Sequence, residues 1–280
     1  MTGNQLKSRS LLVASFIAAA AGTALADPSA MNLLVPFDSN NTAGWTQTMA
    51  PNDDGSSSLI QLGFDFCFYE EDRPSLYVNN NGNVSFSGPY STFSPSGFPS
   101  SSFDMIAPFW GDVDTRNRTD ADTNLVWHKT ITGSSGDPIF VVTWDSVGVY
   151  SNNNSVRNTF QLLLAANDDE FGTDLNAAFS YGNMGWTTGS ASGGVNGFGG
   201  VPATVGINAG DGIRFDQIGR FDHAGNDYGG GGANPPATSG IDYLDGRTYY
   251  FDACQGVVPA PGSLALLGAG GLIAGRRRRS

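Results

Sequence analysis

Apolar and polar residues alternate in short stretches along this chain, and this pattern limits the possible folds more than any other feature of the sequence. In the clearest stretch, 62–69, the apolar residues fall on one face: Leu62, Phe64, Phe66 and Phe68. A period of two residues is typical of a half-buried β-strand. Other stretches with strand character are 76–78, 84–86, 124–131, 139–147, 157–165, 176–182, 203–208 and 247–252. The interior shows no convincing helical periodicity, so the sequence predicts an all-β fold.

Turn-forming residues separate these stretches. The 280 residues include 38 glycines and 14 prolines, and only 14% of the residues are charged. The segment 79–83 reads Asn-Asn-Asn-Gly-Asn and predicts a hairpin turn, because Asn and Gly tolerate positive φ. Short strands joined by such turns predict an antiparallel β-sandwich-like single domain. We place this domain at residues 59–254 and expect residues 27–58 to form a lead-in segment.

The first 26 residues have the layout of a secretory signal peptide. Lys7 and Arg9 precede an apolar stretch, and Ala24 and Ala26 form a small-x-small cleavage site. The sequence therefore predicts a signal helix at 1–26 and an exported protein. An ordinary buried N-terminal helix is the alternative.

The C-terminal segment, 255–280, has three parts in a fixed order. A Val-Pro-x-Pro box comes first, with Val258, Pro259 and Pro261, then an apolar run, and then the cluster Arg276, Arg277, Arg278 and Arg279. As a helix, residues 262–275 would span roughly 21 Å, which is shorter than the ~30 Å hydrocarbon core of a bilayer. Arginines directly after such a run are expected to stay in the cytoplasm.

This order of parts resembles the bacterial PEP-CTERM sorting signal. The resemblance implies a short C-terminal apolar helix that inserts transiently into the membrane and recognition by an exosortase, a sortase-like membrane protease. It also implies release or display at the surface of a bacterium that makes exopolysaccharide. A plain C-terminal membrane anchor is the alternative.

The sequence contains two cysteines, Cys67 in the first strong strand stretch and Cys254 just after the last. In an exported protein, an even number of cysteines favours a disulfide. This bond would close a loop of more than 180 residues and would stabilise the fold by about 5 kcal/mol in the chain-entropy treatment. Two unpaired thiols are the alternative.

The chain is acidic, with a formal net charge of −12 and a pI near 4.3. Residues 1–26 and 255–280 hold basic residues and no acidic ones, so the middle of the chain carries a formal charge of −18. Such a surface repels nucleic acid and attracts divalent cations. We therefore expect no nucleic-acid partner.

One acidic stretch is a candidate calcium site. Its oxygen donors are Asp112, Asp114, Asn117, Asp120 and Asp122. Calcium takes six to eight oxygen ligands, and alternating Asp residues in a turn can supply several. The stretch lacks the glycine and glutamate of an EF-hand loop. Three interpretations stay open: capping of the loop by Asp side chains, calcium binding, or acid/base work in a glycosidase. Calcium is the only cofactor that the sequence suggests.

Other catalytic chemistry finds little support. The chain has no G-x-S-x-G motif, no pair of Cys or His residues with zinc-ligand spacing, and no phosphate-binding glycine loop. His128 and His223 are the only histidines, and each is better explained as a strand or loop residue. Four tryptophans could stack on a sugar, although packing in the core is the favoured interpretation: Trp110, Trp127, Trp144 and Trp186. We predict that the protein is not an enzyme.

Residues 105–114, Met-Ile-Ala-Pro-Phe-Trp-Gly-Asp-Val-Asp, are similar to the opening of the nidogen-like (NIDO) extracellular domain. The likeness covers roughly 60–253, and its further blocks are 82–86, 142–144, 158–162, 185–189 and 203–208. The resemblance implies a non-enzymatic extracellular module associated with cell–matrix adhesion. It supplies no catalytic residues.

Together these features predict an exported bacterial protein, displayed on the surface or released, with a structural or adhesive role. Its expected partners are extracellular matrix or exopolysaccharide and other surface proteins. A calcium-dependent, lectin-like carbohydrate-binding module is the main alternative, and a polysaccharide-active enzyme is a weaker one.

Overall fold

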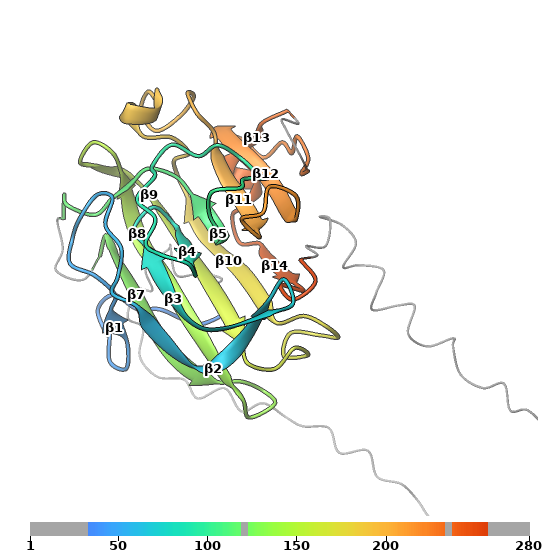
Figure 1. The fold of residues 1–280 in the computed structure, drawn as a ribbon. Coiled ribbons are helices and arrows are strands. Elements are labelled where there is room, and N and C mark those ends of the chain that lie inside the picture. Colours follow the sequence, from blue (N-terminus) through green and yellow to red (C-terminus); the bar gives the residue numbers. More distant parts are fainter. Residues whose placement is uncertain (1–32, 119–122, 233–236, 257–280) are drawn as a thin grey trace, which may run out of the picture.

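The computed structural model describes residues 33–118, 123–232 and 237–256, which form two seven-stranded β-sheets (Figure 1). The strand pairs are antiparallel, apart from β12 with β13. Side chains from both sheets meet in one core. The predicted all-β, sandwich-like fold is therefore confirmed.

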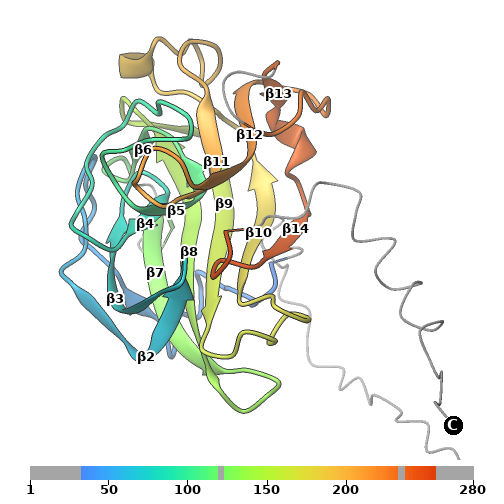
Figure 2. The same ribbon diagram turned by 45° about the vertical axis from the view of Figure 1, so that its right-hand side comes forward.

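The first sheet has the strand order β1-β7-β8-β9-β10-β14, with β6 paired to β8. Its strands are β1 (Thr46–Gln47), β6 (Val113–Asp114), β7 (Leu125–Thr132), β8 (Pro138–Val149), β9 (Asn153–Ala165), β10 (Ala177–Met184) and β14 (Thr248–Phe251). The long strands β7 to β10 follow one another through hairpin connections, and β14 lies beside β10 at the edge (Figure 2).

The second sheet has the strand order β13-β12-β11-β5-β4-β3-β2. Its strands are β2 (Ile60–Phe68), β3 (Glu71–Asn79), β4 (Asn83–Ser85), β5 (Met105–Trp110), β11 (Ala203–Asn208), β12 (Phe215–His223) and β13 (Ser239–Gly240). Two single-turn 3₁₀ helices accompany the strands, Ser190–Ser192 and Ile241–Tyr243.

The central strands of both sheets carry apolar side chains on two faces. In the first sheet Val142 and Trp144 point into the core between the sheets, while Val141 lies on the opposite face. In the second sheet Ile106 joins the core, and Met105 faces away from it. Both outer faces are covered over part of their area, which explains why a strand such as β8 is buried along almost its whole length, while β2 and β3 keep exposed residues.

The segment before β2 covers the outer face of the first sheet. Leu33 and Phe37 pack against Trp127. The backbone N–H of Val35 donates to Gln161 Oε1 (3.1 Å), and Gln161 Nε2 donates back to the carbonyl of Val35 (2.7 Å). The described start of the predicted lead-in segment, residues 33–47, is thus packed against this sheet. On the other sheet, Phe98 and Phe103 cover Trp110 in the same way.

The disulfide between Cys67 and Cys254 closes one end of the domain. It joins the end of β2 to the segment after β14, across a sequence separation of 187 residues. Asn176 stabilises the same end, because its Nδ2 donates to the carbonyl of Cys67 (3.1 Å) and its Oδ1 accepts from the N–H of Ala253 (2.9 Å).

Several predictions fall on parts of the chain that the structure does not describe. These are the signal helix with its cleavage site at Ala24 and Ala26, the C-terminal sorting tail, and the side chains of Asp120 and Asp122. They stay predictions. Within the described residues, no helix has the length and apolar character that would let it cross a membrane.

Candidate functional site

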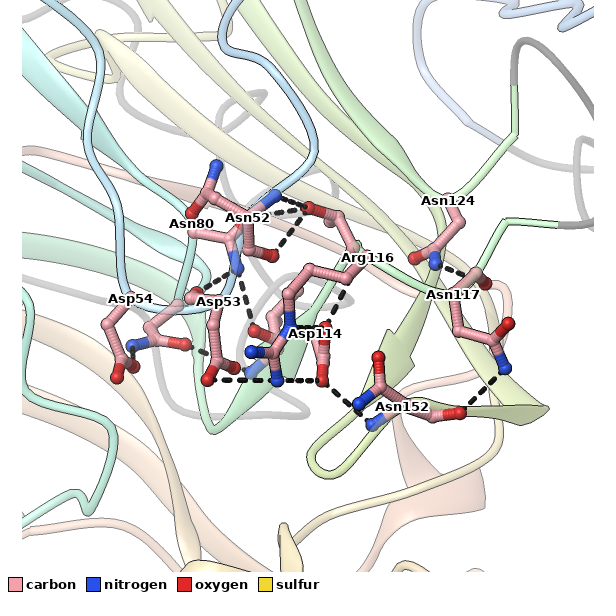
Figure 3. A network of polar contacts seen from close by, with 12 residues as sticks. Asn52, Asp53, Asp54, Asn80, Asp114, Arg116, Asn117, Asn124 and Asn152 are labelled. Carbon is pink, nitrogen blue, oxygen red and sulfur yellow. Dashed lines mark hydrogen bonds and ion pairs between the residues drawn. The ribbon is translucent and has the colours of Figure 1, made fainter.

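At the end of the β2–β3 pair opposite the disulfide, two loops meet. One is the loop 50–57, before β2, and the other is the turn from β5 into β6. Asn52 and Thr115 join them, because the N–H of Thr115 donates to the carbonyl of Asn52 (2.9 Å) and the N–H of Asn52 donates to Thr115 Oγ1 (2.8 Å). Segments about sixty positions apart in the sequence are thereby held side by side (Figure 3).

The asparagine-rich hairpin between β3 and β4 lies beneath these loops and is buried. Asn80 Nδ2 donates to the carbonyl of Val113 (2.7 Å) and to that of Asp53. Asn79 Nδ2 donates to Asn83 Oδ1 (2.7 Å). The predicted hairpin is confirmed, but its side chains serve as internal hydrogen-bond partners for neighbouring loops.

Gly82 is required in this hairpin for two reasons. Its φ is +76°, a conformation that residues with a Cβ rarely adopt. A Cβ at this position would also overlap the carbonyl of Phe109. The hairpin can therefore approach β5 closely only with glycine here.

Three carboxylates gather where the two loops meet. Asp53 and Asp54 come from the loop before β2, and Asp112 comes from the β5–β6 turn. One oxygen of each lies within 4.8 Å of the others. Asp112 is 2% exposed and Asp53 has a side chain that is 20% exposed, so two of the three are largely removed from water.

This crowding changes the protonation of the cluster. Burial, together with the nearby carboxylates of Asp53, Asp54 and Asp114, raises the pKa of Asp112 to about 7. Burial and the charges of Asp114 and Asp54 raise the pKa of Asp53 to about 6, although Arg116 acts in the opposite direction. Both pKa values rise because burial and neighbouring negative charges disfavour the ionised carboxylate.

Asp114, two residues further along, has a different environment. Arg116 holds its carboxylate with two charge-assisted hydrogen bonds, from Nε to Oδ1 (2.9 Å) and from Nη2 to Oδ2 (2.7 Å). The N–H of Asn152 also donates to Oδ2 (2.8 Å). Burial alone would raise the pKa of Asp114, but these hydrogen bonds lower it below its ordinary value. Figure 3 shows Arg116 between Asp114 and Asp53. Arg116 Nη2 also lies 3.1 Å from Asp53 Oδ2.

The structure thus separates the residues of the predicted calcium stretch. Asp112 joins the carboxylate cluster, whereas Asp114 is neutralised by Arg116. Asn117 donates from Nδ2 to the carbonyl of Asn152 (2.7 Å), and its own carbonyl accepts from Asn124 Nδ2 (3.0 Å). Asp114, in β6, and Asn117, in the loop that follows it, are thus hydrogen-bonded to neighbouring segments.

Sequence reasoning missed Asp53 and Asp54, which lie nearly sixty residues before Asp112. The only local signal was two adjacent acids in a Pro-Asn-Asp-Asp-Gly turn, which is also the ordinary composition of an exposed loop.

The tryptophans and histidines considered in the sequence are packed or hydrogen-bonded within the fold. All four tryptophans considered for sugar stacking are buried, with Trp127 the most exposed at 6%. The core-packing interpretation is therefore confirmed. His128 Nδ1 is hydrogen-bonded to Thr48 Oγ1 (3.0 Å). His223 lies between Asp222 and Asp227, at 2.6 and 3.0 Å.

Comparison with known proteins identifies the class of domain. The family model of the nidogen-like domain matches residues 74–224, which run from β3 to just past the end of β12. The chain belongs to the nidogen-like domain family.

Individual relatives agree with this assignment. The chain is similar to alpha-tectorin of Gallus gallus, with 35% identity over 209 residues, covering 68% of this chain and 9% of that protein. It is also similar to nidogen-1 of Mus musculus, with 32% identity over 142 residues, covering 41% of this chain and 11% of that protein. The matched region is thus a small part of these relatives. No solved structure matches the chain significantly.

Proposed function

We propose that this protein is an exported structural or adhesive module of a bacterial cell surface or matrix. The observation that carries the proposal is the nidogen-like family match over 74–224, in a domain whose ends are joined by a disulfide. Disulfides persist mainly in oxidising compartments outside the cytoplasm. Relatives named alpha-tectorin and nidogen support an extracellular role.

Two further features of the sequence support export and sorting. Residues 1–26 have the composition of a signal peptide, and the tail 255–280 resembles a PEP-CTERM signal. In this proposal an exosortase cuts the tail near Pro259, after transient insertion of the apolar run in the membrane. The domain of 59–254, with its lead-in segment, is then released or displayed at the surface.

Intact mass tests the processing. The full chain is expressed in a bacterium that secretes exopolysaccharide, and its mass is measured separately in the envelope and in the medium. The proposal expects a form without residues 1–26 and without the tail. A form that keeps the tail in the envelope would contradict sorting and would support a permanent anchor.

Retention on matrix tests the adhesive role. The processed protein from the medium is incubated with matrix isolated from the same culture and then sedimented. Saturable retention is expected, in contrast to an unrelated acidic protein of similar net charge. No retention above that control would contradict adhesion, whereas release of reducing sugar from the matrix would show an enzyme.

The same assay separates protein partners from glycans. Retention that survives protease treatment of the matrix would favour the lectin-like alternative, with exopolysaccharide as the ligand. Retention lost after protease treatment would favour surface proteins as partners.

A further inference from the structure

The carboxylate cluster carries an inference that does not depend on the adhesive role. We propose that Asp53, Asp54 and Asp112 bind a calcium ion that joins the loop 50–57 to the β5–β6 turn. This ligand set shares only Asp112 with the set that the sequence suggests. Its residues come from two distant segments that the fold brings together.

Buried oxygens without hydrogen-bond donors are the main argument. Among the described residues, none donates to Asp112 Oδ2 or to Asp53 Oδ1, and both atoms are shielded from water. A buried carboxylate oxygen without a donor or a cation is costly. A bound cation would satisfy these oxygens.

The charge of the cluster also favours a bound cation. When ionised, Asp53, Asp54, Asp112 and Asp114 carry four negative charges, and Arg116 is the cation paired with two of them. Asp54 is held in place by Asn81, whose Nδ2 donates to its Oδ1 (2.8 Å), but this amide is neutral. The cluster therefore retains an excess of negative charge that a divalent cation would offset.

The donor set favours calcium over other metals. All three ligands are carboxylates in irregular loops, which suits the variable geometry and the oxygen preference of Ca²⁺. Zinc prefers His and Cys, and both histidines are hydrogen-bonded elsewhere. Magnesium usually binds through one or two carboxylates and keeps most of its waters.

The position of the site suggests what the ion does. Asn80 and Asn81 already contact both loops. A calcium ion at the carboxylates would convert their mutual repulsion into attraction and would hold the loop 50–57 against the turn. In this role it stabilises the end of the domain that lacks the disulfide.

Calcium binding to the full chain is the direct test. The protein is stripped with EDTA, and binding is measured by equilibrium dialysis against radioactive calcium. We expect one saturable site, and Asp112→Asn should weaken it by at least about tenfold, since even the loss of an outer-shell partner costs metal sites that much. Asp174→Asn, which changes an exposed aspartate elsewhere, is the matched control and should bind as the wild type does.

Urea unfolding adds a readout that a merely structural aspartate would not show. In EDTA, Asp112→Asn should unfold at the same urea concentration as the wild type or a higher one, because it removes a repelled buried charge. In about 2 mM calcium the order should reverse, since extracellular calcium modules bind at roughly 10⁻⁴–10⁻³ M. If Asp112→Asn does not fold, the half-buried Asp54→Asn replaces it in both measurements.

Three results would overturn the proposal. The first is a wild-type protein without a saturable calcium site. The second is equal calcium affinity in Asp112→Asn and Asp174→Asn. The third is magnesium binding as tight as calcium binding. The assays contain neither cells nor matrix, so their outcome is separate from that of the adhesion test.

Discussion

The two ends of the β2–β3 pair are held together by different chemistry. At one end, Cys67 and Cys254 form a covalent link. At the other, the connections between segments are non-covalent and include the hydrogen bonds between Asn52 and Thr115, those from Asn80 and Asn81, and an ion pair of Arg116. The covalent link acts mainly by restricting the unfolded chain, whereas the polar contacts depend on every buried partner being satisfied.

Each end also contains an arginine–aspartate pair, and the two pairs differ in burial. Arg116 binds Asp114, whose side chain is fully buried. Arg214 binds Asp211 near the disulfide, where both side chains are partly exposed to water and Arg214 Nη1 also donates to the carbonyl of Tyr69 (3.2 Å). The two arginines are exposed to a similar degree, so the pairs differ mainly in their aspartates, and solvent screens the pair of Arg214 more than that of Arg116.

The largest expected effect comes from removing the covalent link. Cys67→Ala with Cys254→Ala should lower the free energy of unfolding by about 5 kcal/mol, because the bond closes a very long loop. Urea unfolding followed by the fluorescence of the buried tryptophans measures the change. A loss below about 2 kcal/mol, at the low edge of what native disulfides contribute, would mean that the hydrogen bonds of Asn176 already hold this end.

The next largest effect is expected at the end of the β2–β3 pair opposite the disulfide. Asn80→Ala removes the hydrogen bonds to the buried carbonyl of Val113 and the partly buried carbonyl of Asp53, so the free energy of unfolding should fall by about 3 kcal/mol. The exposed Asn40→Ala is the control and should change stability by less than about 0.5 kcal/mol. Equal effects of the two variants would show that the buried hairpin contributes little.

A smaller loss is expected from Arg116→Met, which keeps the stem of the side chain and removes its charge. Breaking a fully buried ion pair costs about 3–5 kcal/mol, and we expect about 2 kcal/mol here because Arg116 is partly exposed and Asn152 still donates to Asp114. Urea unfolding measures the loss. An unchanged midpoint would contradict the assignment of Asp114 as a buried charge that needs its partner.

The smallest effect is expected from Arg214→Met, the counterpart at the disulfide end. Its ion pair with Asp211 is exposed, so water and salt replace most of the interaction. The loss of stability should be smaller than that of Arg116→Met under the same conditions. If the two losses were equal, burial would not be the property that distinguishes the two ends.

Much of the fold follows from local patterns in the sequence. The predicted stretches correspond to β2, β7, β8, β9, β10, β11 and β14 and overlap β3 and β4, and the asparagine-glycine segment forms the turn between β3 and β4. Strand β12 was missed because its pattern includes Gln217, which reads as exposed. In the structure Gln217 is buried and satisfied, since its Oε1 accepts from the N–H of Phe98 (3.0 Å) and its Nε2 donates to the carbonyl of Gly232 (2.8 Å).

Strand β5 was not recognised as a strand for a different reason. Its residues are buried on both faces, so it shows a continuous apolar run without alternation. Its outer face is covered by the segment around Phe98 and Phe103, and no local pattern in the sequence indicates that cover.

Local patterns in the sequence predict most of the strands, the export of the protein and the cysteine pair, although they miss β5 and β12. These predictions depend on side-chain periodicity and composition, which are local properties of the chain. The neighbours of the carboxylates depend on the tertiary structure, which places Asp112 beside Asp53 and Asp54 and Asp114 beside Arg116. Asp112 lies in the turn before β6 and Asp114 lies in β6 itself, so their side chains meet different neighbours although they are only two positions apart. Whether a carboxylate finds a cation or another carboxylate depends on which distant loop packs against it.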